Sequence, residues 1–323
     1  MKAPALAWTG GALLGIFLLA APFVLSAYLL SVLILILYFA FVGQAWNLMM
    51  GFAGQLSLGN ALYVGLGAYV SAALFVHLAV PPALGVLAAA AAGALAATVI
   101  GALAFRFGIS GVHFALLTIA FAEFARLGFA HLEWTGANSG LFLPVRSRSD
   151  IDLLNLRGPP ILFYYLILAL VAGALALVHR LMRSPLGYSW LAIREEPEAA
   201  QSLGIDLFRA RLAVVATGGA MTAVGGVFLA FYTNTLFPSD VFGMHRSIEI
   251  ILAPIIGGLG TFLGPVVGAV LLGVLGETAT AALGALGIQA AGAKQLVYTF
   301  VLLLIVMGLP GGVWPWLWKR WTR

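Results

Sequence analysis

Long stretches without a charged residue dominate the pattern of apolar and polar positions along the chain. The first covers residues 10–50, and later apolar runs occupy 83–105, 112–130, 161–178, 212–231, 248–275 and 296–309. A helix needs about 20 apolar residues to cross the hydrocarbon core of a bilayer. The pattern therefore predicts an all-α polytopic membrane protein, with about eight to ten transmembrane or re-entrant helices.

Composition supports a membrane location. Of the 323 residues, 63% are hydrophobic and 8% charged, and the mean hydropathy is +1.08. Soluble domains carry about 25% charged residues, so this chain has too few to cover a surface in water. The 39 glycines suit close packing of helices in lipid. Lys2 precedes an apolar run too long for a signal peptide, which favours a retained anchor.

The distribution of basic residues predicts the topology. Residues 180–211 form the most charged stretch, and they carry Arg180, Arg183, Arg194, Arg209 and Arg211. The positive-inside rule places this loop and the C-terminal Lys319 and Arg320 in the cytoplasm. An even number of crossings must then separate them, so the run at 248–275 is expected to be two short segments or a re-entrant pair. The loop at 131–159, one span before the cytoplasmic loop, is expected to face outward.

Two short, glycine-dense polar interruptions occur in opposite halves of the chain. One reads GFAGQLSLGN at 51–60 and the other GGLGTFLGP at 257–265. Paired interruptions of this kind mark the substrate path of many transporters, although the glycines could instead serve only close packing. We expect the path to be lined by Gly54, Gln55, Ser57, Gly59, Asn60, Gly257, Gly258, Gly260 and Gly264.

The charged loop contains the pattern of a short surface helix. Pro197 suits the first turn, acidic residues surround it, and Gly204 is a suitable C-terminal stop. The string EAA-x-x-x-G, formed by Glu198, Ala199, Ala200 and Gly204, matches the start of the motif with which permeases of ABC importers dock on their ATPase. An ordinary amphipathic connector is the alternative interpretation.

The chain closely resembles the permease subunits of branched-chain amino acid ABC importers. The resemblance is carried by NLMMGFAGQLSLGNALYVGLGAY at 47–69, FALLTIAFA at 114–122, WTGANSGL at 134–141, SPLGYSWLAIREEPEAAQSLGID at 184–206 and IEIILAPIIGGLGTFLGPVVGAVLL at 248–272. These stretches follow the family's order. The chain resembles the M-type permease more than its H-type partner.

The resemblance implies a single transmembrane permease domain over 1–323, a coupling loop at 180–211 and an outer loop at 131–159. It also implies a bacterial inner-membrane location and three partners: a second permease subunit, cytoplasmic ATP-binding subunits and an extracytoplasmic substrate-binding protein. Branched-chain or other hydrophobic amino acids are the expected cargo, and urea or short amides, carried by close relatives, are the alternative. Beyond membrane lipid, no cofactor, metal or nucleic acid is expected.

The ionisable residues at membrane depth leave other function classes open. Glu123 and Arg126, three residues apart, are expected to pair on one helix face, whereas Glu249 and Glu277 are expected at water boundaries. An ion-coupled secondary transporter would use a buried carboxylate such as Glu123. An intramembrane enzyme would need a catalytic constellation that the sequence does not assemble, and no Walker A string indicates ATP binding by this chain.

Overall fold

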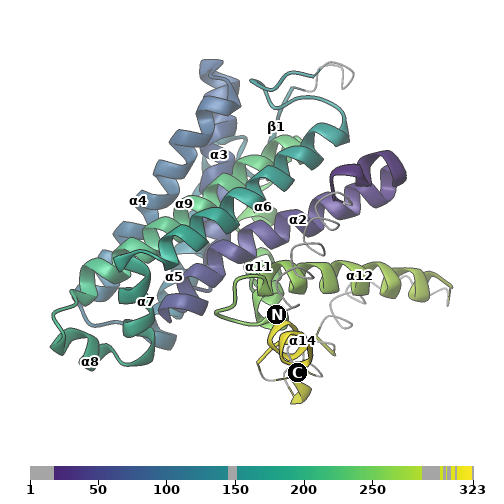
Figure 1. Ribbon diagram of the computed structural model, residues 1–323. Helices are drawn as coiled ribbons and strands as arrows, with labels where there is room; N and C mark the ends of the chain where they lie inside the picture. The colour runs from purple at the N-terminus through teal and green to yellow at the C-terminus, as the bar shows by residue number, and fades with distance from the viewer. Residues whose placement is uncertain are drawn as a thin grey trace.

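The computed structural model describes residues 18–144, 151–285, 299–300, 303, 307–309 and 311–321, and these are mostly helical (Figure 1). Seven of the described helices are long and apolar enough to cross a membrane. They are α2 (Ala27–Asn47) with its π-helical continuation η1 (Leu48–Phe52), α3 (Asn60–Leu78), α4 (Pro82–Arg106), α5 (Gly111–His131), α6 (Pro160–Met182), α9 (Leu207–Thr233) and α12 (Gly264–Ala285).

The predicted all-α membrane architecture is confirmed. Four predicted runs, 83–105, 112–130, 161–178 and 212–231, coincide with α4, α5, α6 and α9 to within a few residues. Seven long helices and the shorter α11 (Met244–Gly257) agree with the expected number. The N-terminal residues around Lys2 and most of the last predicted run, 296–309, lie outside the described residues.

Helix ends follow from local sequence. Ser26 caps α2 by accepting a hydrogen bond from the Leu29 N–H, and Asp206 caps α9 by accepting one from the Arg209 N–H. Helices α4 and α6 begin with proline at the first turn, where its missing N–H is not needed.

Small residues allow α9 to pack along α3 and α4. Gly219 of α9 lies against Gly93 of α4, and Ala223 of α9 lies against Gly67 of α3. Such contacts let helix backbones approach closely and gain dispersion energy in lipid, where no hydrophobic effect draws helices together. The high glycine content is thus partly explained by this interface.

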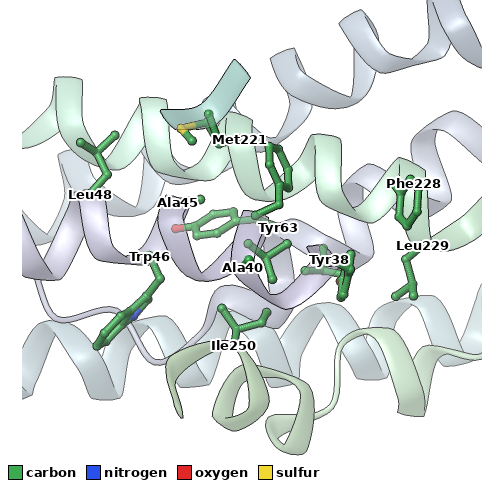
Figure 2. Close-up of a cluster of buried hydrophobic side chains, with 14 of the residues drawn as sticks. Tyr38, Ala40, Ala45, Trp46, Leu48, Tyr63, Met221, Phe228, Leu229 and Ile250 are labelled. Carbon is green, nitrogen blue, oxygen red and sulfur yellow. The ribbon is translucent and has the colours of Figure 1, made fainter. Parts of the chain in front are cut away.

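Large side chains fill the centre of the bundle, where α2, α3, α9 and α11 meet. Figure 2 shows Tyr38 and Trp46 of α2 beside Tyr63 of α3, Phe228 of α9 and Ile250 of α11, and all five are at most 2% exposed. Both α11 and α12 pack against α2 on the side of the molecule away from α4 (Figure 1).

Both predicted interruptions are present. Helix α2 ends in the π-helical turn η1, and residues 54–59 are non-helical before α3 begins. Residues 258–263 separate α11 from α12, so the run at 248–275 is divided into two segments as the charge argument required.

The charged stretch at 180–211 contains more helix than expected. The predicted short helix after Pro197 is present as α8 (Pro197–Ser202), but a second helix, α7 (Pro185–Glu195), precedes it. The ends of α6 and α9 also extend into the stretch. Helix α7 was not predicted because its charged end, Arg194 and Glu195, concealed an apolar face whose Trp190 and Ile193 are buried.

A small cap covers the opposite end of the bundle from α7 and α8 (Figure 1). It contains η2 (Glu133–Thr135), η3 (Ala137–Ser139) and β1 (Leu141–Phe142), which pairs antiparallel with β2 (Thr235–Leu236). The four-residue helix α10 (Pro238–Val241) follows β2, and α14 (Val313–Trp321) lies near the C-terminus.

Candidate functional site

The first interruption lies inside the bundle. Gln55, Ser57 and Asn60 are 6%, 1% and 0% exposed. The Ser57 hydroxyl donates to Asn60 Oδ1 at 3.0 Å, and Gln55 Nε2 donates to the Ala53 carbonyl at 2.9 Å. Trp46 Nε1 donates to the Ser57 carbonyl at 2.6 Å. Backbone that leaves a helix at membrane depth must find such partners, because lipid offers none.

Two hydroxyl groups from other helices satisfy the N-terminus of α3. Thr118 of α5 accepts from the N–H groups of Leu58 and Gly59, at 3.1 and 3.2 Å. Ser247 of α11 accepts from the Ala61 N–H at 2.9 Å. The first N–H groups of a helix have no partner within it, so α5 and α11 supply what water would supply at a surface.

The second interruption is a tight turn made possible by glycine. Gly260 has φ +69°, a left-handed conformation that side chains disfavour. The Thr261 hydroxyl donates to the Gly258 carbonyl at 2.7 Å. Gly257, the last residue of α11, packs against the backbone of Gly264, the first residue of α12.

Asn47 joins the two interruptions directly. Its Nδ2 donates to the Thr261 carbonyl at 2.9 Å, and its Oδ1 accepts from the Gly260 N–H at 2.9 Å. The side chain is fully buried at the end of α2. One amide therefore completes a reciprocal pair of hydrogen bonds between segments more than 200 residues apart in the chain.

Arg194 of α7 reaches the same junction. Its Nη1 donates to the Gly51 carbonyl at 2.6 Å, and Gly260 lies directly against the same guanidinium. Gly54 lies against the Cα and the aliphatic stem of Arg194. We call the contact between Asn47, Gly51, Gly260 and Arg194 the junction. It connects both interrupted segments to the first helix of the charged stretch.

Two buried amides flank the first interruption with unpaired atoms. Neither side-chain polar atom of Gln44 has a hydrogen-bond partner among the described residues, and neither does Asn60 Nδ2. Buried polar atoms are usually paired. Unpaired ones therefore call for an explanation, such as a water molecule or a polar solute that reaches them.

The residues of the EAA string occupy α8 and the turn after it. Glu198 and Ala199 are exposed, whereas Ala200 is 2% exposed and anchors the helix. Gly204 has φ +87°, and no atom lies within 4 Å of where its Cβ would be. Its N–H donates to the Gln201 carbonyl at 2.9 Å. Gly204 thus ends the helix as predicted, and α8 presents an exposed acidic face.

Sequence reasoning missed Asn47 and Arg194 as site residues. Asn47 is an amide at the end of a long apolar run, which is a usable signal because lipid does not satisfy its hydrogen bonds. Arg194 was counted only as one of several charges that set topology. Its proximity to Gly51 depends on how α7 folds back onto the bundle, and a local sequence pattern cannot predict that arrangement.

Two of the i,i+3 ion pairs among the described residues lie in α5 and α11. Glu123 and Arg126 of α5 are joined at 2.5–2.8 Å, as predicted. Arg246 of α11, which the sequence did not single out, lies between Glu249 at 3.1 Å and Asp240 at 3.0 Å. The interpretation of Glu249 as a solvated helix-end charge is therefore incomplete.

Glu277 lies within α12, and its carboxylate accepts a hydrogen bond from the Tyr28 hydroxyl of α2. This bond links the distal part of α12 to the start of α2. The expected place of Glu277 at a water boundary stays a prediction.

Residues 28–307 match the model of the family described as branched-chain amino acid transport system, permease component. The LivM high-affinity branched-chain amino acid permease protein of Salmonella typhimurium is 29% identical over 190 residues, covering 52% of this chain and 44% of LivM. A probable LivH permease protein from Methanocaldococcus jannaschii is 29% identical over 158 residues, covering 49% of this chain and 47% of LivH.

More distantly, the fructose import permease FrcC of Rhizobium meliloti is 26% identical over 167 residues, covering 50% of this chain and 43% of FrcC. The matched regions thus span less than half the length of these curated relatives. No solved structure matches the chain.

Proposed function

The chain belongs to the family of permease components of branched-chain amino acid transport systems, and from this premise we propose that it is a membrane-spanning subunit of an ATP-driven importer. It is a multi-pass inner-membrane protein and a non-catalytic transport component. Its proposed cargo is branched-chain or other hydrophobic amino acids. The proposed partners are a second permease subunit, cytoplasmic ATP-binding subunits and an extracytoplasmic substrate-binding protein, with this chain as the M-type subunit.

Helices α7 and α8, with the turn ending at Gly204, are proposed to dock on the ATP-binding subunit. In this proposal the exposed face of α8, which carries Glu198 and Ala199, contacts the ATPase, while the buried Ala200 holds α8 to the bundle. The cap containing η2, η3 and β1 lies at the opposite end of the bundle (Figure 1). We assign this end, with the loop at 131–159, to docking of the substrate-binding protein.

The observation that carries the proposal is the junction. A movement of α7 driven by the ATPase would pull on the Gly51 carbonyl through Arg194, and Asn47 would pass the displacement to Gly260. The Gly260–Asn47 bond, at 2.9 Å, has the length of a well-formed hydrogen bond, and the Arg194–Gly51 bond, at 2.6 Å, is shorter still. The two interrupted segments would then open or close together rather than one at a time.

The proposed path runs beside both interruptions. On the first segment it involves Gly54, Gln55, Ser57, Gly59 and Asn60, and on the second Gly257, Gly258, Gly260 and Gly264. Non-helical backbone at membrane depth is tolerated where it lines a cavity or contacts protein. The unpaired amide atoms of Gln44 and Asn60 support a polar path here.

Reconstitution tests this function. Proteoliposomes containing this chain, its second permease subunit and the ATP-binding subunits should take up leucine only when ATP and the binding protein are both present. Uptake by this chain alone in response to a proton or sodium gradient would instead identify a secondary transporter.

A further inference from the structure

A cleft of about 330 Å³ lies between α2, α11 and α12, apart from the junction. This volume is at the lower end of the range typical of small-molecule sites, about 300–1,000 Å³. Its walls come from three helices that are far apart in the sequence. Two of its lining residues, Arg246 and Glu249, form the ion pair of α11.

Two ion pairs fix the arginine at the charged end of the cleft. Arg246 is held between Glu249 and Asp240, and its side chain is only 14% exposed. The Arg246 Nε is buried and has no hydrogen-bond partner among the described residues. The buried Tyr38 hydroxyl also has none there, and it is close enough to Arg246 to interact with it electrostatically. Arginine offers five N–H donors in a planar fork suited to a carboxylate.

Apart from Glu277 of α12, whose carboxylate accepts a hydrogen bond from the Tyr28 hydroxyl, the rest of the cleft lining is apolar. Leu35 and Phe39 line it from α2, Leu252 from α11 and Leu272 from α12. An arginine and a glutamate that line a cleft between membrane helices cannot face lipid without a large cost. The cleft must therefore meet water, a solute or another protein subunit.

We propose that this cleft binds an α-amino acid zwitterion with an apolar side chain, an inference that rests on the proposed transport function. The carboxylate of the solute pairs with Arg246, its ammonium group pairs with the Glu249 carboxylate, and its side chain packs against Leu35, Phe39 and Leu272. A zwitterion offers one charge of each sign at the separation of a single carbon atom, which matches adjacent members of an ion pair.

The same chemistry discriminates against neutral solutes. Urea and short amides carry no net charges with which to compensate Arg246 and Glu249, and they leave the apolar wall unfilled. Sites built to bind polar groups strongly reject analogues that lack those groups, because the buried partners in the site are then left unpaired. The cleft therefore favours amino acids over urea among the cargoes of this family.

Direct binding to the assembled importer tests the proposal. Radiolabelled L-leucine is added to the purified complex of both permease subunits and the ATPase, without binding protein, in a scintillation-proximity assay. Competition is measured with leucinamide, which lacks the carboxylate, with 4-methylpentanoate, which lacks the ammonium group, and with urea. We expect each competitor to bind at least about tenfold more weakly than leucine, as the loss of a charge-assisted hydrogen bond implies.

The matched variants are Glu249→Gln and Glu123→Gln. Each removes the carboxylate of an arginine–glutamate pair spaced i,i+3, but only Glu249 lines the cleft. We expect Glu249→Gln to weaken leucine binding about tenfold and Glu123→Gln to leave it unchanged. Equal binding by both variants, effective competition by urea, or no leucine binding by the wild type would overturn the proposal.

A second variant tests the proposal independently of whether Glu249→Gln folds correctly. Leu35→Trp keeps every charge and narrows the apolar end, so it should weaken binding of leucine more than binding of alanine. Equal effects on both amino acids would contradict the assigned orientation. ATP-driven uptake by the wild type is measured in parallel. Its absence would refute the proposed function, whereas normal uptake with unaltered Glu249→Gln binding would refute only the cleft assignment.

Discussion

The Asn47 side chain lies where two hydrogen bonds connect segments from opposite halves of the chain. Both of its polar atoms are used, and within the described part of the chain no other hydrogen bond joins Gly260 or Thr261 to the first segment. At this scale the junction depends on one amide rather than on a broad surface.

We expect Asn47→Ala to lower the stability of the purified permease. The change leaves the partly buried Gly260 N–H and Thr261 carbonyl without their partner, a cost of at most about 1–3 kcal/mol per group. The melting temperature, followed by intrinsic tryptophan fluorescence, should fall by several degrees. Ser71→Ala is the control, because the Ser71 hydroxyl is equally buried but has no hydrogen-bond partner among the residues that the structure describes. Equal melting temperatures for the two variants would contradict this account.

Arg194→Ala tests transmission through the junction. The variant loses the bond to the Gly51 carbonyl, worth about 1.5–3 kcal/mol for a charged donor. We expect leucine uptake per ATP hydrolysed to fall about tenfold, while ATPase turnover continues. Arg209→Ala is the control, since its side chain is 87% exposed and, within the described ranges, forms an ion pair only with nearby Asp206. A transport ratio unchanged in Arg194→Ala would exclude Arg194 from coupling.

Residue-level prediction succeeded where chemistry is local. The Glu123–Arg126 pair and the helix stop at Gly204 follow from spacing and from glycine's tolerance of positive φ. Arg194 and Arg246 were missed because their partners, Gly51 and Asp240, are set by how whole elements fold back. A charged residue in a sequence does not reveal which backbone or side-chain atom it will contact in the fold.

At the scale of elements, α7 and α8 together form the largest departure from the predicted pattern. The sequence indicated one short helix, and the structure has two, with α7 carrying Arg194 and α8 carrying the exposed Glu198. The interruption at 258–263 was predicted correctly, because a topological argument from charge required the run at 248–275 to be divided.

Gly204→Leu tests the turn after α8. A leucine at φ +87° costs about 1–2 kcal/mol, and no neighbouring atom would clash with it. We expect less ATPase subunit to co-purify with the permease, because the turn shapes the proposed docking surface. Gly108→Leu is the matched control, with φ +71° and equally open surroundings after α4. If both variants retain the ATPase equally, the docking assignment is wrong.

Glu198→Lys examines the same surface without straining the backbone. The side chain is exposed on α8 and makes no ion pair among the described residues. Reversal of its charge should reduce co-purification of the ATPase while leaving the amount of inserted permease unchanged. Glu133→Lys, in the cap at the opposite end of the bundle, should retain the ATPase.

At the scale of the whole molecule, the two interrupted segments meet beside α7, and the outer cap lies at the other end of the bundle (Figure 1). Hydropathy predicted the helices, and glycine content predicted where two of them break. Neither pattern could predict that the two interrupted segments contact each other, because the contact between Asn47 and Gly260 is a property of the packed bundle. The cleft at Arg246 was hidden for the same reason, since its walls come from α2, α11 and α12.

The most direct test of the central claim is the ratio of leucine imported to ATP hydrolysed in proteoliposomes that contain the complete importer. The proposed account predicts a fixed, measurable ratio for the wild type that requires the binding protein, and a ratio about tenfold lower for Arg194→Ala with ATP hydrolysis retained. Leucine uptake that proceeds without ATP, or a ratio identical in wild type and Arg194→Ala, would contradict it.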